Sequence, residues 1–183
     1  MAAFTVIDHT ELVSSANSYT KSSIPSSYDH LYFVASVRTD ASTYADYAEM
    51  EFNADTTTSN YSYTLLLASD TGTATPASSR GTTAQAISLF GGEVCGASTT
   101  ADTFSTVKMW IPNYANTTDF KSAIISVTTE NASTTDYQWQ LRQGANLWHS
   151  TAAINELKYY VYDIGGDDFV QYSTFTLYGV TGA

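Results

Sequence analysis

The segment FVQYSTFTLYGV, residues 169–180, indicates the fold because hydroxyl-bearing and apolar residues alternate through its second half. In a β-strand successive side chains point to opposite faces, so this alternation is typical of a strand with one buried face. Three residues follow the segment. We therefore predict that it is the closing strand of a β fold, with Phe175 and Leu177 in the core, and that it is structural, with no catalytic tail after it.

The same period-two pattern recurs along the whole chain, and helical periodicity is hard to find. Between the alternating runs lie clusters of Gly, Asn, Asp, Ser and Thr, which favour turns. About ten short strands separated by turns predict an antiparallel β-sandwich or barrel. The clearest strands, with the residues expected to point inward, are 30–38 (Leu31, Phe33, Ala35, Val37), 47–54 (Ala48, Met50, Phe52), 105–112 (Val107, Met109, Ile111), 119–130 (Ala123, Ile125, Val127) and 136–143 (Tyr137, Trp139, Leu141).

Length and pattern predict one domain. Its 183 residues suffice for a hydrophobic core. Residues 11–183 are expected to form the sandwich, and residues 1–10 either an N-terminal arm or the first strand. The stretch 70–82 is expected to be the longest loop. The single cysteine, Cys95, excludes an internal disulfide, fits synthesis in a reducing cytoplasm and is expected to be a buried thiol.

Charge excludes several classes of partner. The formal net charge is −11, and the seven Lys and Arg residues are scattered singly. Nucleic-acid binding requires clustered cations that displace counterions from phosphates, so we expect no nucleic-acid partner. No apolar run approaches the roughly 18 residues of a membrane helix, and the N-terminus lacks the features of a signal peptide. We expect no membrane insertion.

Catalytic and metal-binding patterns are weak. The three histidines are far apart in sequence, and no nucleotide-binding or nucleophile-elbow motif is present. Glu49 and Glu51 lie on one face of one predicted strand, roughly 7 Å apart, which suits a glycosidase carboxylate pair. The pattern favours a solvated strand face instead. Asp167 and Asp168 are interpreted as turn acids rather than calcium ligands. We predict no enzyme activity, no cofactor and no metal.

Six segments stand out in this order: TELVSS (10–15), SSIPSSYDHLYFVASVR (22–38), FNADTTTSNYS (52–62), IPNYANTTDFKS (111–122), LWHSTAAI (147–154) and STFTLYGV (173–180). Together they make the chain similar to a family of small tailed-phage virion surface proteins. The resemblance covers about residues 10 to 180, and Ala54 stands where family members often have glycine. It implies a β-sandwich of jelly-roll type on the outside of a phage particle, and it carries no catalytic residues.

From this resemblance we expect a capsid decoration (cement) protein at the virion surface, made in the host cytoplasm. Its expected partners are the major capsid protein and copies of itself, as a homotrimer. Phe4, Val6 and Ile7 are candidates for a capsid or subunit contact. The alternative is a tail-fibre or receptor-binding adhesin that recognises host glycans, with Trp110 as the residue that stacks on a sugar because it shares a face with Lys108.

Overall fold

The computed structural model describes residues 3–57, 59–70, 74–84, 86, 93–130, 139–162 and 166–182. The described residues form twelve strands and no helix. The strands pair antiparallel in two sheets, which confirms the predicted all-β sandwich. The large sheet contains, in spatial order, β1 (Ala3–Glu11), β12 (Thr174–Thr181), β3 (His30–Val37), β8 (Ser105–Pro112), β9 (Lys121–Glu130), β10 (Trp139–Trp148), β5 (Tyr61–Asp70) and β6 (Ala74–Ala84). The small sheet contains β2 (Ser18–Lys21), β11 (Leu157–Val161), β4 (Ala45–Phe52) and β7 (Glu93–Cys95).

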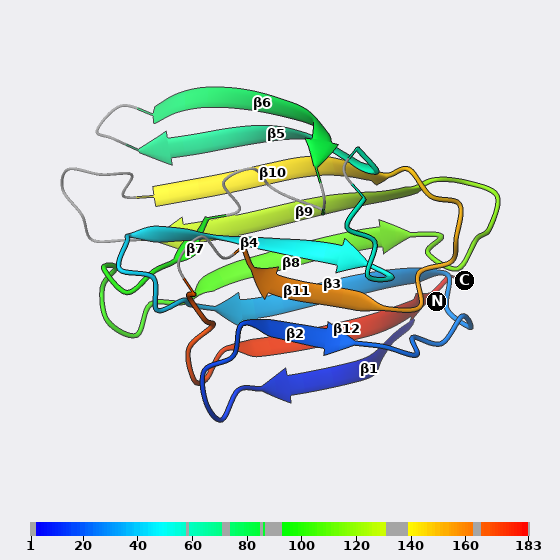
Figure 1. The fold of residues 1–183 in the computed structure, drawn as a ribbon, viewed down its shortest axis with the longest axis horizontal. Coiled ribbons are helices and arrows are strands. Elements are labelled where there is room, and N and C mark those ends of the chain that lie inside the picture. Colours follow the sequence, from blue (N-terminus) through cyan, green and yellow to red (C-terminus); the bar gives the residue numbers. More distant parts are fainter. Residues whose placement is uncertain are drawn as a thin grey trace.

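The chain crosses repeatedly between the two sheets, as expected for a sandwich of jelly-roll type. Strands β1 to β4 alternate between the large and the small sheet, and β11 of the small sheet is followed by β12 of the large one. In Figure 1 the small sheet lies in front of the large sheet, and the two chain ends lie close together. The last strand, β12, pairs with β1 on one side and β3 on the other. It therefore closes the large sheet from an interior position rather than from its edge.

The core fills the space between the sheets, and most of the predicted inward residues are there. Phe33, Met109, Met50, Phe175 and Leu177 are fully buried, so the inward faces predicted for β3, β8, β4 and β12 are confirmed. Cys95 is also buried, as predicted. Aromatic rings make up much of this core: Tyr19 stacks on Phe175 with ring centroids 4.9 Å apart.

Strand β10 has the opposite parity from the one predicted. Leu141 is 48% exposed, whereas Arg142 next to it is buried. The pairing of Arg142 with the inward Val127 of β9 fixes this register, and a shift of one residue moves every side chain of a strand to the other face. Tyr137 and the side chain of Trp139 lie outside the described residues.

One further expectation is corrected. Most of the stretch 70–82, predicted to be a loop, belongs to the hairpin of β5 and β6. Strand β6 is the edge of the large sheet, where Pro76 is tolerated because one side of the strand has no partner to bond. Ala3–Glu11 form β1, which pairs along its length with β12, so these residues belong to the large sheet.

The segment 52–62 contains a strained turn. Asn53 and Ala54 have φ angles of 53° and 52°, in the left-handed region that disfavours residues with a Cβ atom. Glycine would adopt this conformation freely, so Ala54 places strain on the backbone. The turn is closed by the Asp55 amide, which donates to the Phe52 carbonyl at 3.0 Å.

Candidate functional site

The outward side of the large sheet carries a continuous row of residues that crosses seven strands. The register places them side by side, each the direct partner of the next, in the order Val6, Tyr178, Tyr32, Trp110, Ile124, Ala145 and Thr64. The neighbouring row runs from His9 through Thr176, Val34, Lys108, Ser126 and Gln143 to Leu66. On the other side of the first row, Phe4 lies near Tyr32 and Tyr178. We call this surface the aromatic face.

The rings of the aromatic face pack against one another. Ring centroids of Phe4 lie 5.8 Å from Tyr32 and 6.0 Å from Tyr178, both edge to face. Trp110 is half-buried, and its ring is tilted by 50° to His30 and by 52° to Tyr32. Such edge-to-face clusters add stability beyond the area they bury. They form a rigid surface in which the Trp110 ring packs against its neighbours and does not present an isolated flat face.

The fold brings together residues that the sequence suggested for different roles. Phe4 and Val6, candidates for a protein contact, share the aromatic face with Trp110, the candidate for a glycan contact. Phe4 is 57% exposed, Val6 56% and Ile124 60%. Ile7 does not join them. A β-bulge between Val6 and Asp8 makes Ile7 an extra residue in the ladder, and its side chain packs against the core.

The aromatic face differs in charge from the rest of the protein. The net charge of the chain is −11, yet no Asp or Glu occurs among the described side chains of these two rows or at Phe4. The ionisable side chains described there are Lys108, His9 and tyrosines. Scattered apolar residues are normal on a surface, but a contiguous apolar and aromatic face is typical of an interaction site.

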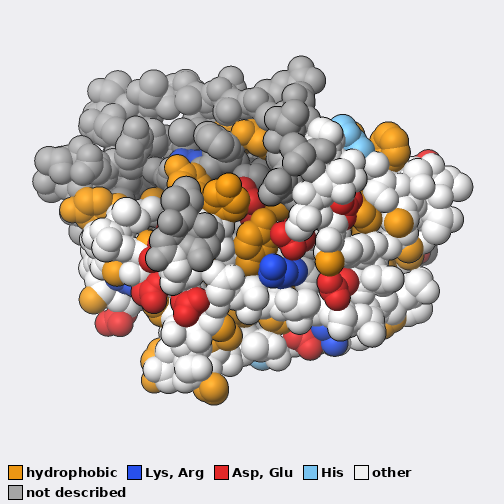
Figure 2. All heavy atoms as spheres, in the orientation of Figure 1, with side chains coloured by type: hydrophobic (Ala, Val, Ile, Leu, Met, Phe, Trp, Pro, Cys, Tyr) orange, Lys and Arg blue, Asp and Glu red, His pale blue; other side chains and the backbone are white. Residues whose placement is uncertain are grey.

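The small sheet presents an outward face of the opposite character. Figure 2 views the molecule from this side and shows acidic side chains and a basic one near the middle of the surface. Lys158 and Tyr160 of β11 pair with Glu51 and Glu49 of β4, so the four side chains share one face. Glu51 is 7% exposed, which corrects the predicted solvated strand face.

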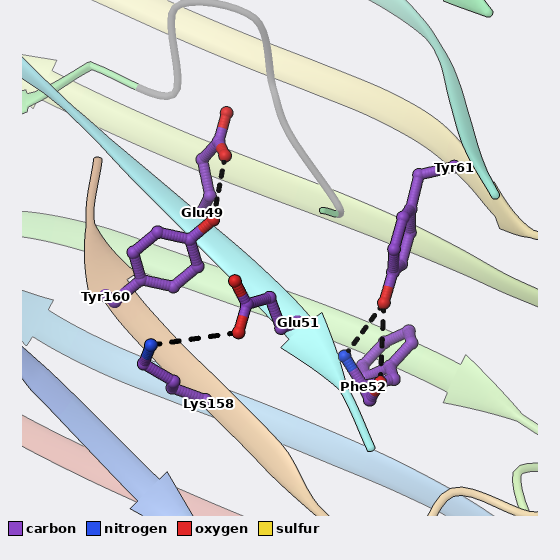
Figure 3. Close-up of polar contacts among 6 residues, drawn as sticks. All are labelled: Glu49, Glu51, Phe52, Tyr61, Lys158 and Tyr160. Atoms are coloured by element: carbon purple, nitrogen blue, oxygen red, sulfur yellow. Dashed lines mark hydrogen bonds and ion pairs between the residues drawn. The ribbon is translucent and has the colours of Figure 1, made fainter. Parts of the chain in front are cut away.

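The contacts of these four side chains form a linked group (Figure 3). The Tyr160 hydroxyl donates to Glu49 Oε2 at 3.1 Å, and Lys158 Nζ lies 3.8 Å from Glu51 Oε2 and 4.7 Å from the centre of the Tyr160 ring. Burial, followed by the charges of Glu49 and Glu51, raises the pKa of Tyr160. The tyrosine therefore remains a hydrogen-bond donor to carboxylates. We interpret the group as a structural link between β4 and β11, since each carboxylate has a partner.

A polar groove lies where the free edges of the two sheets meet, between β1 and β2. Its volume is about 350 Å³, and it is lined by Asp8, Thr10, Leu12, Ser18, Tyr19, Thr20, Lys21 and Ser22. Asp8 is at its centre. Its Oδ2 accepts from the Tyr19 hydroxyl at 2.8 Å and the Thr10 hydroxyl at 3.2 Å, and its Oδ1 lies 3.4 Å from Lys21 Nζ.

The sequence did not suggest this groove. Its residues follow from the bulge at Ile7, because the extra residue turns Asp8 and Thr10 toward the inner side of the sheet, opposite Leu177 and Phe175. A bulge is not visible as a change in residue type. The only signal was the loss of apolar residues at alternate positions after Ile7.

Trp148 and the remaining acidic side chains gain no support as sites. Trp148 is buried, and its indole donates to Asp55 Oδ2 at 2.8 Å. Within the described ranges, no group of three or more His, Cys, Asp or Glu side chains is arranged to hold a metal ion. The same residues contain no helix of the length and hydropathy that a membrane span requires.

Comparison with known proteins gives little further information. No family model and no curated protein sequence matches the chain. A similar solved structure is that of SCP-B, a member of the eqolisin family of peptidases, in a complex with the tripeptide Ala-Ile-His. It is 12% identical, the alignment covers 92% of this chain and 74% of that one, and the TM-score is 0.25. A likeness of this degree gives no basis for transferring an activity.

Proposed function

We propose that this protein is a capsid decoration (cement) protein of a tailed bacteriophage, which binds the outer surface of the major capsid shell and stabilises it. The observation that carries the proposal is the aromatic face. It is a surface with exposed aromatic and apolar side chains and without described acidic ones, on a strongly acidic molecule. The resemblance of the six sequence segments to phage virion proteins supplies the biological setting.

The aromatic face covers more than half of the area of a typical protein interface. Strands lie about 4.8 Å apart, and alternate residues lie about 7 Å apart along a strand, so two rows across seven strands cover roughly 470 Å². Specific protein complexes bury about 800 Å² on each partner. Exposed anchors such as Phe4 and Ile124 lie within this area, and aromatic residues contribute much of the binding energy in such interfaces.

The distribution of charge gives the protein two different sides. With the aromatic face on the shell, the side with Glu49 and Glu51 points toward solvent. Each bound copy would then stabilise the assembled shell by mass action, because it binds the folded, assembled state. We propose copies of the chain as further partners, arranged as a homotrimer.

The copy number in purified virions tests the location. A decoration protein should occur in numbers comparable with the major capsid protein, measured by quantitative gel of purified particles. A copy number comparable with that of a tail protein would favour the adhesin alternative and contradict our proposal.

Binding to shells tests the surface. Shells that lack the protein should bind the unmodified chain in co-sedimentation. Ile124→Glu should weaken binding by about tenfold or more, because it places a charge in an apolar interface. Val13→Glu is the matched control, since Val13 is exposed and lies outside the aromatic face. Equal binding by both variants would show that another surface docks.

A further inference from the structure

We propose that the groove between β1 and β2 is a binding site for a neutral sugar, a pyranoside without ionised groups. This inference goes beyond the proposed capsid function and does not depend on it. The groove volume of about 350 Å³ lies at the lower end of the range for small-molecule sites, which suits a ligand of one or two sugar rings.

The side chains of the groove match the chemistry of a sugar. Each sugar hydroxyl both donates and accepts hydrogen bonds, so a site needs donors and acceptors close together. The groove provides a carboxylate acceptor in Asp8 and an ammonium donor in Lys21. Four further residues of the lining carry hydroxyl groups, which donate and accept. They are Thr10, Ser18, Thr20 and Ser22.

The central ion pair is held in place before any ligand binds. Tyr19 is 5% exposed, and its ring stacks on Phe175 in the core. Burial, and then the hydrogen bond to Asp8, raises the pKa of Tyr19, so its hydroxyl remains a donor that orients the Asp8 carboxylate. An ionised carboxylate has about four acceptor positions, and three donors approach that of Asp8. A fourth position and the remaining protons of Lys21 are available to a ligand.

The charge of the groove selects against ionic ligands. Asp8 and Lys21 neutralise each other at 3.4 Å, so the groove offers no net charge to a cation. An anion would approach a protein of net charge −11. Neither effect disfavours a neutral polyhydroxyl ligand.

The position of the groove leaves it open in the docked protein. Asp8 and Thr10 lie on the inner side of β1, whereas Phe4 and Val6 belong to the aromatic face. In Figure 1, β1 and β2 lie together along one edge of the sandwich. A copy bound to a shell through the aromatic face would therefore present the groove sideways to the medium.

The test is a titration of the full chain followed by two-dimensional amide NMR spectra. The probes are the methyl glycosides of glucose, galactose and mannose, with methyl glucuronide and glucosamine as charged comparisons. We expect saturable shifts in the millimolar range for at least one neutral glycoside, confined to Asp8, Tyr19 to Ser22 and their neighbours. Both charged probes should bind more weakly than that glycoside.

Two variants and one control separate binding from a structural role. Asp8→Asn and Lys21→Met should each weaken binding by about tenfold. Lys108→Met removes a lysine charge from the aromatic face and should leave binding unchanged. If a groove variant fails to fold, the location of the chemical-shift changes in the unmodified chain still shows whether the glycoside binds in the groove.

The inference is overturned if no neutral glycoside produces saturable shifts, if the shifts map to the aromatic face, or if the charged probes bind as well. It is also overturned if both groove variants bind normally. Binding to shells is measured separately, so a failure here leaves the capsid proposal standing.

Discussion

Replacing Gly179 by alanine tests whether the last strand is locked by the loop that precedes β3. Gly179 lies on the inner side of β12, opposite Leu31 of β3. A Cβ atom built at Gly179 would lie 2.3 Å from Cδ2 and Cγ of Tyr28 and 2.6 Å from its Cε2. Ordinary carbon contacts are about 3.5 to 4.0 Å. The Tyr28 ring therefore covers the glycine directly and would have to move.

The expected cost follows from two opposing effects. Overpacking of a well-packed site costs typically 1 to 3 kcal/mol, by forcing side chains and backbone to shift, so about 2 kcal/mol is expected here. Alanine in a strand is more favourable than glycine by roughly 0.5 to 1 kcal/mol. The net loss in the free energy of unfolding should be about 1 to 2 kcal/mol. For a domain of this length, that lowers Tm by about 2 to 8 °C.

A double-mutant cycle in urea, with thermal melts, measures the effect. In the Tyr28→Ala background the ring is absent, so Gly179→Ala should be neutral or slightly stabilising, with a coupling energy of about 2 kcal/mol. Gly182→Ala is the control, because its Cβ would meet only the Asp29 side chain, at 3.2 Å. Our reasoning is refuted if Gly179→Ala melts like the unmodified chain, or if it costs the same with and without Tyr28.

Three other outcomes follow from the structure. Partial burial acts to raise the pKa of Asp55, but hydrogen bonds from Asn60 and Trp148 outweigh it and hold that pKa at about 2. The stability that this lowered pKa contributes is fully present at pH values above the ordinary Asp pKa near 3.9, and it is lost as the pH falls toward 2. In thermal melts in acid, Asp55→Asn should therefore show a smaller fall in Tm over that pH range than the unmodified chain. Ala54→Gly should raise the free energy of unfolding in urea by up to about 1 kcal/mol by relieving left-handed strain; unchanged stability would argue against the strain. Deletion of residues 174–183 removes β12 from between β1 and β3, so a soluble truncated chain with a cooperative melt in circular dichroism would contradict its structural role.

Alternation predicted the strands well where one face of a strand is plainly apolar. In β3 and β8, residues such as Phe33 and Met109 alternate with polar or amphipathic residues and are buried as predicted. Burying these residues removes apolar area from water, so the inward side is decided by the strand itself. The aromatic face was therefore partly visible in the sequence, since Trp110 was placed on the outward side beside Lys108.

Alternation failed where both faces of a strand are mixed. Strand β10 carries Leu141 and Leu147 on one face but Trp148 on the other, so composition did not identify the inward side. The pairing with β9 decides it, and that pairing is a contact between distant segments. The burial of Glu51 is a similar case. Glu51 lies beside Lys158 of β11, more than a hundred residues away in sequence, so the alternation within β4 could not predict that Glu51 is buried.

The bulge at Ile7 explains how one short strand serves two surfaces. In a regular strand, Val6 and Asp8 would point to the same side, and either a carboxylate would lie on the aromatic face or Val6 would lie in the polar groove. The extra residue reverses the parity, so Phe4 and Val6 point outward while Asp8 and Thr10 point toward β2. Ile7 itself is partly buried and packs against the core. The aromatic face and the groove therefore depend on one irregular residue, and bulges at sheet edges commonly redirect side chains in this way.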